Sequence, residues 1–471
     1  MGRLLRIANI KKTIYYLKKN GLRQAWYAAR ERAAKEISER YEYSPLPEHV
    51  LAAERLRSAK LSYRFSVVVP VYDPDPLHLR AMIESVIDQS YDKWELILAD
   101  AGSDPSVTAI IKDYQERDGR VHYRKVPENK GISGNTNYAL RYTTGDYVGL
   151  LDHDDRLTPD ALYEMAEAIH NSACRGVTVQ MLYSDEDKCD NEGMVFFDHH
   201  RKPPINLDMI LSNNYICHFL VMRRELIQTL EFRSAYDGAQ DYDLVLRAID
   251  NMLGRASRRT AAERMVSLRH LREETVHIDK VLYHWRCHAD STADNPQSKD
   301  YAYEAGKRAI EDFLRKRGWN GEVGHTRHLG FYRVSFIPDE LYARPEIGII
   351  GGRLINRNRR IAGGIYKGDG TPLFNGLHKE YSGYMHRATL RQEAEAVDVR
   401  CMMVSPAVEE YLEEVIGLPY LRNQRTGRFD WKGGLKEEAD YKKISLEFCQ
   451  RVRAAGFVIV WDPGMEEWLK Y

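Results

Sequence analysis

The sequence predicts an α/β protein with a parallel sheet at its centre, a helical arm before the sheet and a partial repeat after it. Three observations support this fold class. Apolar β-branched segments alternate with helical periods from residue 65 onward, polar residues follow several of these segments, and residues 343–471 resemble part of the preceding pattern. A length of 471 residues is too great for one ordinary core and indicates two or three domains.

The composition is that of a soluble globular protein. Hydrophobic residues make up 43% and charged residues 29% of the chain, and 69 basic residues balance 69 acidic ones. This balance creates no global field and by itself argues neither for nor against a nucleic-acid partner. We expect no such partner. The six cysteines show no CxxC or framework spacing, which favours reduced thiols in the cytoplasm and argues against structural zinc.

Residues 1–60 form a strongly basic arm and a linker. Apolar residues such as Ile14, Leu22 and Trp26 recur among Arg and Lys with a helical period that Gly21 interrupts. Two interpretations stay open. The arm lies on an anionic membrane at the inner face of the cell, or it packs on the main body or on a second copy in a homodimer. No apolar run reaches the ~18 residues of a membrane-spanning helix, and no signal peptide is recognisable, so we expect a cytoplasmic chain.

The elements of the sheet follow in order after this arm. FSVVVPVY (65–72) is an apolar strand that the breakers in DPDP stop. LHLRAMIESVIDQ (77–89) has a helical period, WELILAD (94–100) is a second strand, PSVTAIIKDYQERD (105–118) a second helix and VHYRKV (121–126) a third strand. This alternation predicts right-handed βαβ units and a parallel sheet.

Ligands of parallel sheets bind at the carboxyl ends of strands, which singles out several polar residues. Pro70, Tyr72 and Asp73 end the first strand, and Asp100 ends the second. Asp100 could accept a hydrogen bond from a nucleotide base or a ribose hydroxyl, although an Asp in this position is also a common cap.

The segment PENKGISGNTNYAL (127–140) precedes a helical stretch. It includes Asn129, Gly131 and Asn135. Backbone and side-chain amides at the start of a helix suit phosphate or sugar hydroxyls, and a flexible loop is the alternative.

Crowded acids follow the apolar run YVGLL (147–151). Asp152, Asp154 and Asp155 place three carboxylates in four positions, where they repel one another. Asp152 and Asp154 can hold a hard divalent ion, because Mg²⁺ and Mn²⁺ keep open positions for substrate phosphates. A solvated acidic turn is the alternative.

Two acidic segments follow further along the chain. We interpret MLYSDEDK (181–188) as another acidic strand end. In GAQDYDLVLR (238–247), Asp241 lies at the start of a helical pattern. An acid at this position is usually a cap, but one that faces a metal–phosphate cleft could accept a proton from an attacking hydroxyl.

The segment VLYHWRCHADS (281–291) gathers histidine, arginine and serine after a strand-like stretch. Imidazole and guanidinium groups suit a leaving pyrophosphate, and imidazole can also bind a metal.

In this order the motifs resemble an inverting family-2 glycosyltransferase of the GT-A fold. The matching segments cover roughly residues 64–295: VVVPVYD, WELILADAGSD, NKGISGNTN, GDYVGLLDHDD, YSDEDK, GAQDYDLVLR and LYHWRCHADS. The resemblance extends to bacterial enzymes of cell-surface polysaccharide synthesis, including rhamnosyltransferase-like members. It implies a Rossmann-like mixed sheet, a UDP- or dTDP-sugar donor, Mn²⁺ or Mg²⁺, and a glycan or lipid-linked glycan acceptor.

The resemblance also implies roles for single residues. Asp241 matches the catalytic base, and Asp152 and Asp154 match the DxD element on ribose, metal and diphosphate, with Asp155 beside them. The implied donor contacts are Pro70, Tyr72, Asp73, Asp100, Asn129, Gly131, Asn135, Asp152, His284 and Arg286. The implied acceptor-side residues are Asp185, Asp187, Gln240 and Asp243. Two residues depart from the family pattern, since Asp73 replaces a common Asn and Gln240 a common Glu.

Residues 343–471 resemble the latter half of the preceding domain. VRCMMVSPAVEEYL (399–412) parallels ICHFLVMRRELI (216–227), and aligning Arg451 with Arg247 places Ser445 opposite Asp241. No counterpart of VVVPVY or DHDD precedes this region. We therefore expect a catalytic domain at 61–295, a helical connector at 296–342 and a degenerate, noncatalytic half domain that binds acceptor, dimerises or only stabilises.

Two other functions compete with glycosyl transfer. A sugar-1-phosphate nucleotidyltransferase could use the same acidic metal site, but PVYDPDP lacks the glycine-rich triphosphate loop. A noncatalytic sugar-nucleotide-binding scaffold is the other, and the intact DHDD and Asp241 argue against it.

Overall fold

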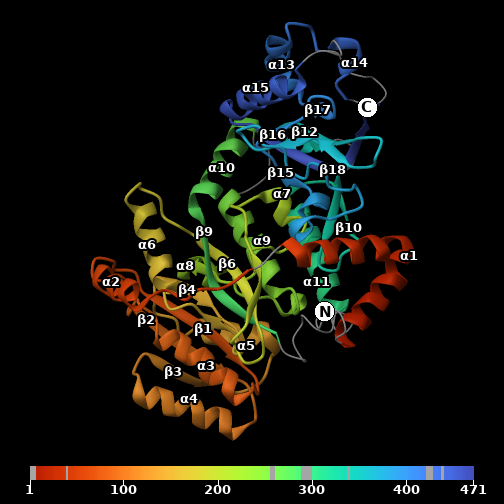
Figure 1. The fold of residues 1–471 in the computed structure, drawn as a ribbon. Helices are drawn as coiled ribbons and strands as arrows, with labels where there is room; N and C mark the ends of the chain where they lie inside the picture. The colour runs from red at the N-terminus through yellow and green to blue at the C-terminus, as the bar shows by residue number, and fades with distance from the viewer. Residues whose placement is uncertain are drawn as a thin grey trace.

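A computed structural model describes residues 7–38, 41–254, 260–287, 300–336, 340–420, 428–435 and 440–470. Its main body is a nine-stranded sheet in the order β3-β2-β1-β4-β8-β6-β9-β5, with β7 paired to β6 (Figure 1). The strands are β1 (Phe65–Val71), β2 (Trp94–Asp100), β3 (Val121–Lys125), β4 (Tyr147–Leu150), β5 (Arg156–Leu157), β6 (Met181–Cys189), β7 (Phe196–His200), β8 (Leu220–Arg223) and β9 (Thr275–Arg286).

The first four strands pair in parallel, as the alternation of strands and helices predicts. Beyond β4 the direction changes: β8 runs antiparallel to β4, β6 runs antiparallel to β8, and β9 runs parallel to β6. The result is a mixed sheet, which confirms the GT-A fold class implied by the resemblance.

Helices cover both faces of the sheet because the apolar side chains of its strands alternate. Val67 and Val69 of β1 pack with α3 (Pro76–Ile87), α4 (Pro105–Arg117) and α6 (Ala161–Ala173) on one face. Val68 faces the opposite cluster. The helices that contribute to that cluster are α5 (Gly131–Leu140), α7 (Leu207–Ile210), α8 (Arg224–Leu230), α9 (Gln240–Leu253), α10 (Ala261–Glu274) and α11 (Asp300–Arg317).

The connector differs from the purely helical one that we expected. After α11 the chain forms the hairpin of β10 (Gly321–His325) and β11 (Tyr332–Phe336), followed by the short α12 (Glu340–Ala343). A second sheet of five strands follows in the order β13-β12-β18-β15, with β17 paired to β12. Its main elements are β12 (Ile347–Ile355), β13 (Ile361–Gly363), β15 (Gln392–Glu393), β17 (Met402–Val404), α13 (Glu409–Ile416), α14 (Trp431–Gly434), α15 (Tyr441–Ala454) and β18 (Val458–Trp468).

The second sheet repeats the strand pairing around β6. β12 pairs with the hairpin strand β13, antiparallel with β17 and parallel with β18, as β6 pairs with β7, β8 and β9. The ion pairs Asp243–Arg247 and Glu447–Arg451 both join residues four apart on the corresponding helices. We therefore propose that residues 343–471 are a partial copy of the main domain.

This copy lacks a carboxylate where the main domain has Asp241. Ser445 is buried, its hydroxyl donates to the Tyr441 carbonyl oxygen at 2.6 Å, and it accepts from the Val399 backbone at 3.0 Å. A hydroxyl held in this way cannot act as a general base at neutral pH. The geometry supports a noncatalytic role for this half.

The N-terminal arm forms α1 (Ile7–Ser38), which is kinked at Gly21, and α2 (Glu48–Ser58). Figure 1 shows α1 beside β10 and the second sheet. The Tyr27 ring stacks on His378 at 4.8 Å, and Gln24 donates to Glu380 at 3.0 Å. One face of the arm therefore packs on the body of the protein. Among the helices that the structure describes, none combines the length and apolarity needed to cross a bilayer.

A buried ion network joins the two halves. Arg344 is fully buried and donates to both oxygens of Asp208 at 2.7 and 2.9 Å and to Glu340 at 3.1 Å. Arg391 binds the same two carboxylates at 3.0 and 2.6 Å. Asp208 lies on α7 of the main body, whereas Arg391 precedes β15, so the network fixes the second sheet against the first domain.

Arg344→Met should destabilise the protein strongly, because it leaves Asp208 and Glu340 buried with half of their compensating charge. We expect the free energy of unfolding to fall by about 3–5 kcal/mol in chemical denaturation. Arg315→Met is the control, since Arg315 is 75% exposed in its pair with Asp312, and it should cost less than about 1 kcal/mol. Equal effects of the two substitutions would contradict this role of the network.

Candidate active site

The carboxyl ends of β1 and β2 lie side by side, with Val71 opposite Asp100 in the register. Asp73 ties the turn after β1 to the loop after β2, because its Oδ1 accepts from the backbone N–H groups of Ser103 at 2.9 Å and Asp104 at 3.0 Å. The structure therefore brings together the predicted donor residues at these two strand ends.

Tyr72 and Asp100 differ in what they offer to a ligand. Tyr72 is 56% exposed beside this edge, whereas Asp100 is buried. The Asp100 carboxylate accepts hydrogen bonds from the Gly102 backbone at 2.9 Å, from Thr108 at 2.8 Å and from Tyr123 at 3.1 Å. Asp100 thus already shapes the loop that follows β2, as its alternative role as a cap requires.

The predicted amide-rich segment forms the start of α5, which begins at Gly131. The Asn129 side-chain oxygen accepts from the Gly131 backbone at 3.0 Å and from the Asn135 amide at 2.9 Å, and the Lys130 backbone donates to Asn135 at 3.1 Å. These bonds fix a compact turn at the helix N-terminus. Asn129 and Gly131 are exposed, whereas Asn135 is buried within the helix.

The DHDD loop follows β4 and is anchored at both ends. The His153 Nδ1 atom lies 3.2 Å from the Pro70 carbonyl oxygen of β1. Asp155 is buried, and its carboxylate accepts from Tyr283 and from the Arg286 backbone N–H at 2.7 Å. Burial and the charges of Asp154 and Asp152 raise the pKa of Asp155 well above its usual value.

Arg286 holds this loop from the other side. Its Nε donates to the Asp154 carbonyl oxygen at 2.7 Å, and its Nη1 donates to the Asn191 carbonyl oxygen at 2.6 Å. Arg286 is buried on β9, so the structure gives it a positioning part beside the donor role implied by the resemblance. Residues 288–291 of that motif lie outside the described residues.

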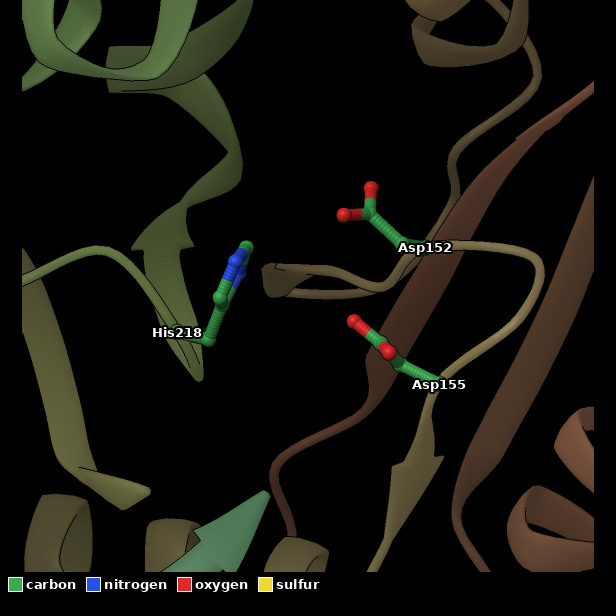
Figure 2. A group of neighbouring side chains, drawn as sticks. All are labelled: Asp152, Asp155 and His218. Carbon is green, nitrogen blue, oxygen red and sulfur yellow. The ribbon is translucent and has the colours of Figure 1, made fainter. Parts of the chain in front are cut away.

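Three side chains converge at the open side of the loop. Asp152, Asp155 and His218 each offer a ligand atom, and these atoms all lie within 4.8 Å of one another (Figure 2). Asp152 is half-buried, and its backbone N–H donates to the Tyr283 hydroxyl at 3.4 Å. Two carboxylates and one imidazole are donors that fit a divalent ion such as Mn²⁺.

Asp241 is the second residue of α9 and faces the same region. Its Oδ2 accepts a long hydrogen bond of 3.3 Å from Gln240. Burial, together with the negative charge of Asp152, raises the pKa of Asp241 to about 6, and His218 acts in the opposite direction. The fold therefore brings the charge of Asp152 in the DHDD loop close enough to act on Asp241, although 89 positions separate the two residues in the sequence.

The prediction that MLYSDEDK is a strand end is wrong. β6 runs through this segment to Cys189, and Asp185, Glu186 and Asp187 lie buried inside the strand. Burial raises the pKa of Asp185, but hydrogen bonds from His199 and His277 outweigh it and hold the pKa below its usual value. The strand continues because these carboxylates are paired.

The other two acids of β6 are paired as well. Glu186 accepts from Lys202 at 3.0 Å, and Asp187 contacts His284 at 2.6 Å and accepts from Tyr41 at 2.8 Å. His284 of the predicted donor set is therefore bound to a buried carboxylate. We leave Asp185 and Asp187 out of the proposed acceptor site.

The structure also separates Asp243 from Asp241. Residues two apart on a helix point to opposite sides. Asp243 is buried, where it accepts hydrogen bonds from Arg233 and, at 2.8 Å, from Arg247. It belongs to an ion network on the far side of α9, whereas Gln240 remains beside Asp241.

His218 is the site residue that the sequence did not indicate. It precedes β8 in NNYICHFLV, and its ring stacks on Tyr283 at 4.6 Å. A single histidine beside an apolar strand carries no local signal. Only the position of β8 between β4 and β6 places it beside the DHDD loop.

Comparison with known proteins gives three findings. Residues 66–230 match the protein family described as Glycosyl transferase family 2. The chain is 29% identical to the uncharacterized protein y4gI of Sinorhizobium fredii, over 88% of this chain and 54% of that protein. It is 32% identical to the O-antigen biosynthesis protein RfbC of Myxococcus xanthus, over 69% of this chain and 22% of that protein.

The chain thus spans about half the length of the first relative and about a fifth of the second. A crystal structure of an S. aureus TarS fragment in complex with UDP-GlcNAc aligns with this chain at a TM-score of 0.40 and 17% sequence identity. The alignment covers 53% of this chain and 66% of the TarS fragment. The family match ends at residue 230 and therefore does not include Asp241.

Proposed function

Because residues 66–230 form a domain of glycosyl transferase family 2, we propose that this chain transfers a sugar from a nucleoside-diphosphate sugar to a hydroxyl group of a growing cell-surface glycan. The observation that carries the proposal is the electrostatic coupling of Asp241 to Asp152 and His218, two members of the potential ligand group at the DHDD loop. The name of the relative in O-antigen biosynthesis supports a polysaccharide acceptor.

Asp241 acts as the general base in this proposal. It takes the proton of the acceptor hydroxyl while that oxygen bonds to the anomeric carbon, and the bond from this carbon to the diphosphate breaks. The attack comes from the face opposite the diphosphate, so the configuration inverts. A pKa of about 6 leaves Asp241 ionised at neutral pH yet more basic than an ordinary Asp, which suits a general base.

A divalent cation, Mn²⁺ or Mg²⁺, fits the carboxylates of the DHDD loop. Asp152 and Asp155, which offer ligand atoms in one group, would hold it together with Asp154. The bonds of Asp155 to Tyr283 and Arg286 also keep the loop in place. When bound, such a cation offsets the negative charge of the departing diphosphate. The donor base and sugar would lie against the exposed Tyr72 at the end of β1.

We further propose that α1 attaches the protein to an anionic membrane surface. One side of the helix contacts the body through Tyr16, Asn20, Gln24, Tyr27 and Glu31, and the opposite side faces solvent. Leu22 is 80% exposed and Trp26 52% exposed on that side. The exposed cations around them are Lys18, Lys19, Arg23 and Arg30. Apolar anchors among cations, with no exposed acid between residues 16 and 31, suit anionic headgroups.

Asp241→Asn should abolish sugar transfer and leave donor binding intact, because the amide cannot accept the proton. We expect the turnover rate to fall by about 10²–10⁴-fold, measured with a radiolabelled nucleotide sugar, and calorimetry should show unchanged binding of nucleotide and Mn²⁺. Asp250→Asn, on the same helix but paired with Arg317, is the control and should retain activity. Full activity of Asp241→Asn would reject Asp241 as the base.

The pH profile provides a second readout of the same base. Asp241 works only when deprotonated, and its pKa is raised from 3.8 to about 6. In the wild-type enzyme, kcat/KM should therefore fall about tenfold per pH unit below pH 6. Activity that holds to pH 4 would mean that a different group accepts the proton.

The double substitution Leu22→Ser with Trp26→Ser should release the protein from anionic vesicles. Burying one such side chain is worth about 1.5–3 kcal/mol, so co-sedimentation with phosphatidylglycerol vesicles should weaken by at least about tenfold. Leu56→Ser is the matched control, because Leu56 on α2 is also 80% exposed. Equal binding of the two variants to anionic vesicles would exclude this side of α1 as the membrane-binding surface. Wild-type binding that is as strong on neutral as on anionic vesicles would exclude the role of its cations.

A further inference from the structure

Among the residues that the structure describes, His218 is the one imidazole whose ring joins Asp152 and Asp155 in a potential ligand group (Figure 2). The family resemblance assigns it no role. We propose that His218 supplies a nitrogen ligand to the divalent cation of the transfer site, beside Asp152 and Asp155. The inference rests on the proposed function. It adds His218, which lies just before β8, to the residues that hold the cation.

The main chain and the ring of His218 are both fixed before any ion binds. Its backbone N–H donates to Glu186 at 3.2 Å, and its carbonyl oxygen accepts from the buried Lys202. The ring lies parallel to Tyr283 at 4.6 Å, with 10° between the planes. The imidazole is thus held in one orientation, which a ligand requires and a freely rotating surface histidine lacks.

Asp155 is oriented in the same way. One carboxylate oxygen accepts from the Arg286 backbone at 2.7 Å, and the other accepts from Tyr283. Each carboxylate oxygen has two acceptor positions, so these bonds leave one on each oxygen. Ligating carboxylates are commonly held by such outer hydrogen bonds. Tyr283 therefore supports two members of the set, since it stacks on His218 and donates to Asp155.

The donor set predicts which ion is preferred. Mg²⁺ favours oxygen ligands, whereas first-row transition ions accept imidazole nitrogen readily. A site with one imidazole among carboxylates should therefore bind Mn²⁺ in preference to Mg²⁺. His153 lies in the loop itself, but its Nδ1 is 3.2 Å from the Pro70 carbonyl oxygen, and it is not part of the ligand group.

Pulsed electron paramagnetic resonance of the 471-residue chain with Mn²⁺ alone tests this ligand. In the wild type we expect modulation from a ¹⁴N nucleus bound directly to Mn²⁺. Labelling with ¹⁵N-histidine should replace this modulation with a ¹⁵N signal, and His218→Gln should abolish it. Mn²⁺ affinity should fall by about tenfold or more in that variant, since disturbing even outer partners of a metal site costs about 10–100-fold. His153→Gln is the matched control and should keep both the signal and the affinity.

Persistence of the nitrogen signal in His218→Gln, or its absence from the Mn²⁺-bound wild type, would overturn the assignment. His218→Asn provides a smaller replacement if the Gln variant does not fold, and the same loss is expected. Sugar transfer by the wild type, measured in parallel, separates the two proposals. If sugar transfer is active and stimulated by Mn²⁺ but no histidine coordination is detected, His218 is rejected as a metal ligand and the proposed function still holds.

Discussion

Charge compensation at the carboxyl ends of the central strands is the constraint on which the rest of the structure depends. A carboxylate removed from water needs a cation or several hydrogen-bond donors. The acids of β6 (residues 185–187) find these partners within the chain, from β7, β9 and the linker before α2. Asp152 lies beside another carboxylate and an imidazole instead, and we propose that an external cation completes the charge balance at the loop after β4.

Local sequence patterns predicted most of the strands and helices of the first domain. β1, β2 and β3 and the helices between them lie where the apolar periods predict them, because each of these elements buries its own face of the sheet. The prediction failed at β6, where partners outside the segment decide the outcome. Asp185 is paired inside the strand by His199 and by His277, which is 92 positions away. His218 was missed for the same reason.

We propose that the second half is a partial copy of the first domain that lacks its catalytic residues. It has the same strand pairing around β12 and the helix α15, and Ser445 stands opposite Asp241 when the two sequences are aligned at Arg451 and Arg247. Its apolar residues also complete the first core, since Ile347 and Val460 join Leu268 and Leu271 of α10 in one cluster. The half domain contacts α1 through His378 and Tyr27 and is joined to the first domain by the Arg344 network.

The central claim is that the edge formed by β1, β2 and the DHDD loop binds a nucleoside diphosphate together with a divalent cation. Thermal unfolding of the 471-residue chain is measured with UDP, dTDP or GDP, each with and without Mn²⁺. A ligand at a hundred times its Kd stabilises the native state by about 2.7 kcal/mol, so one of these nucleotides should raise Tm clearly, and only with the metal present. Unchanged Tm with every nucleotide at millimolar concentration would contradict the account.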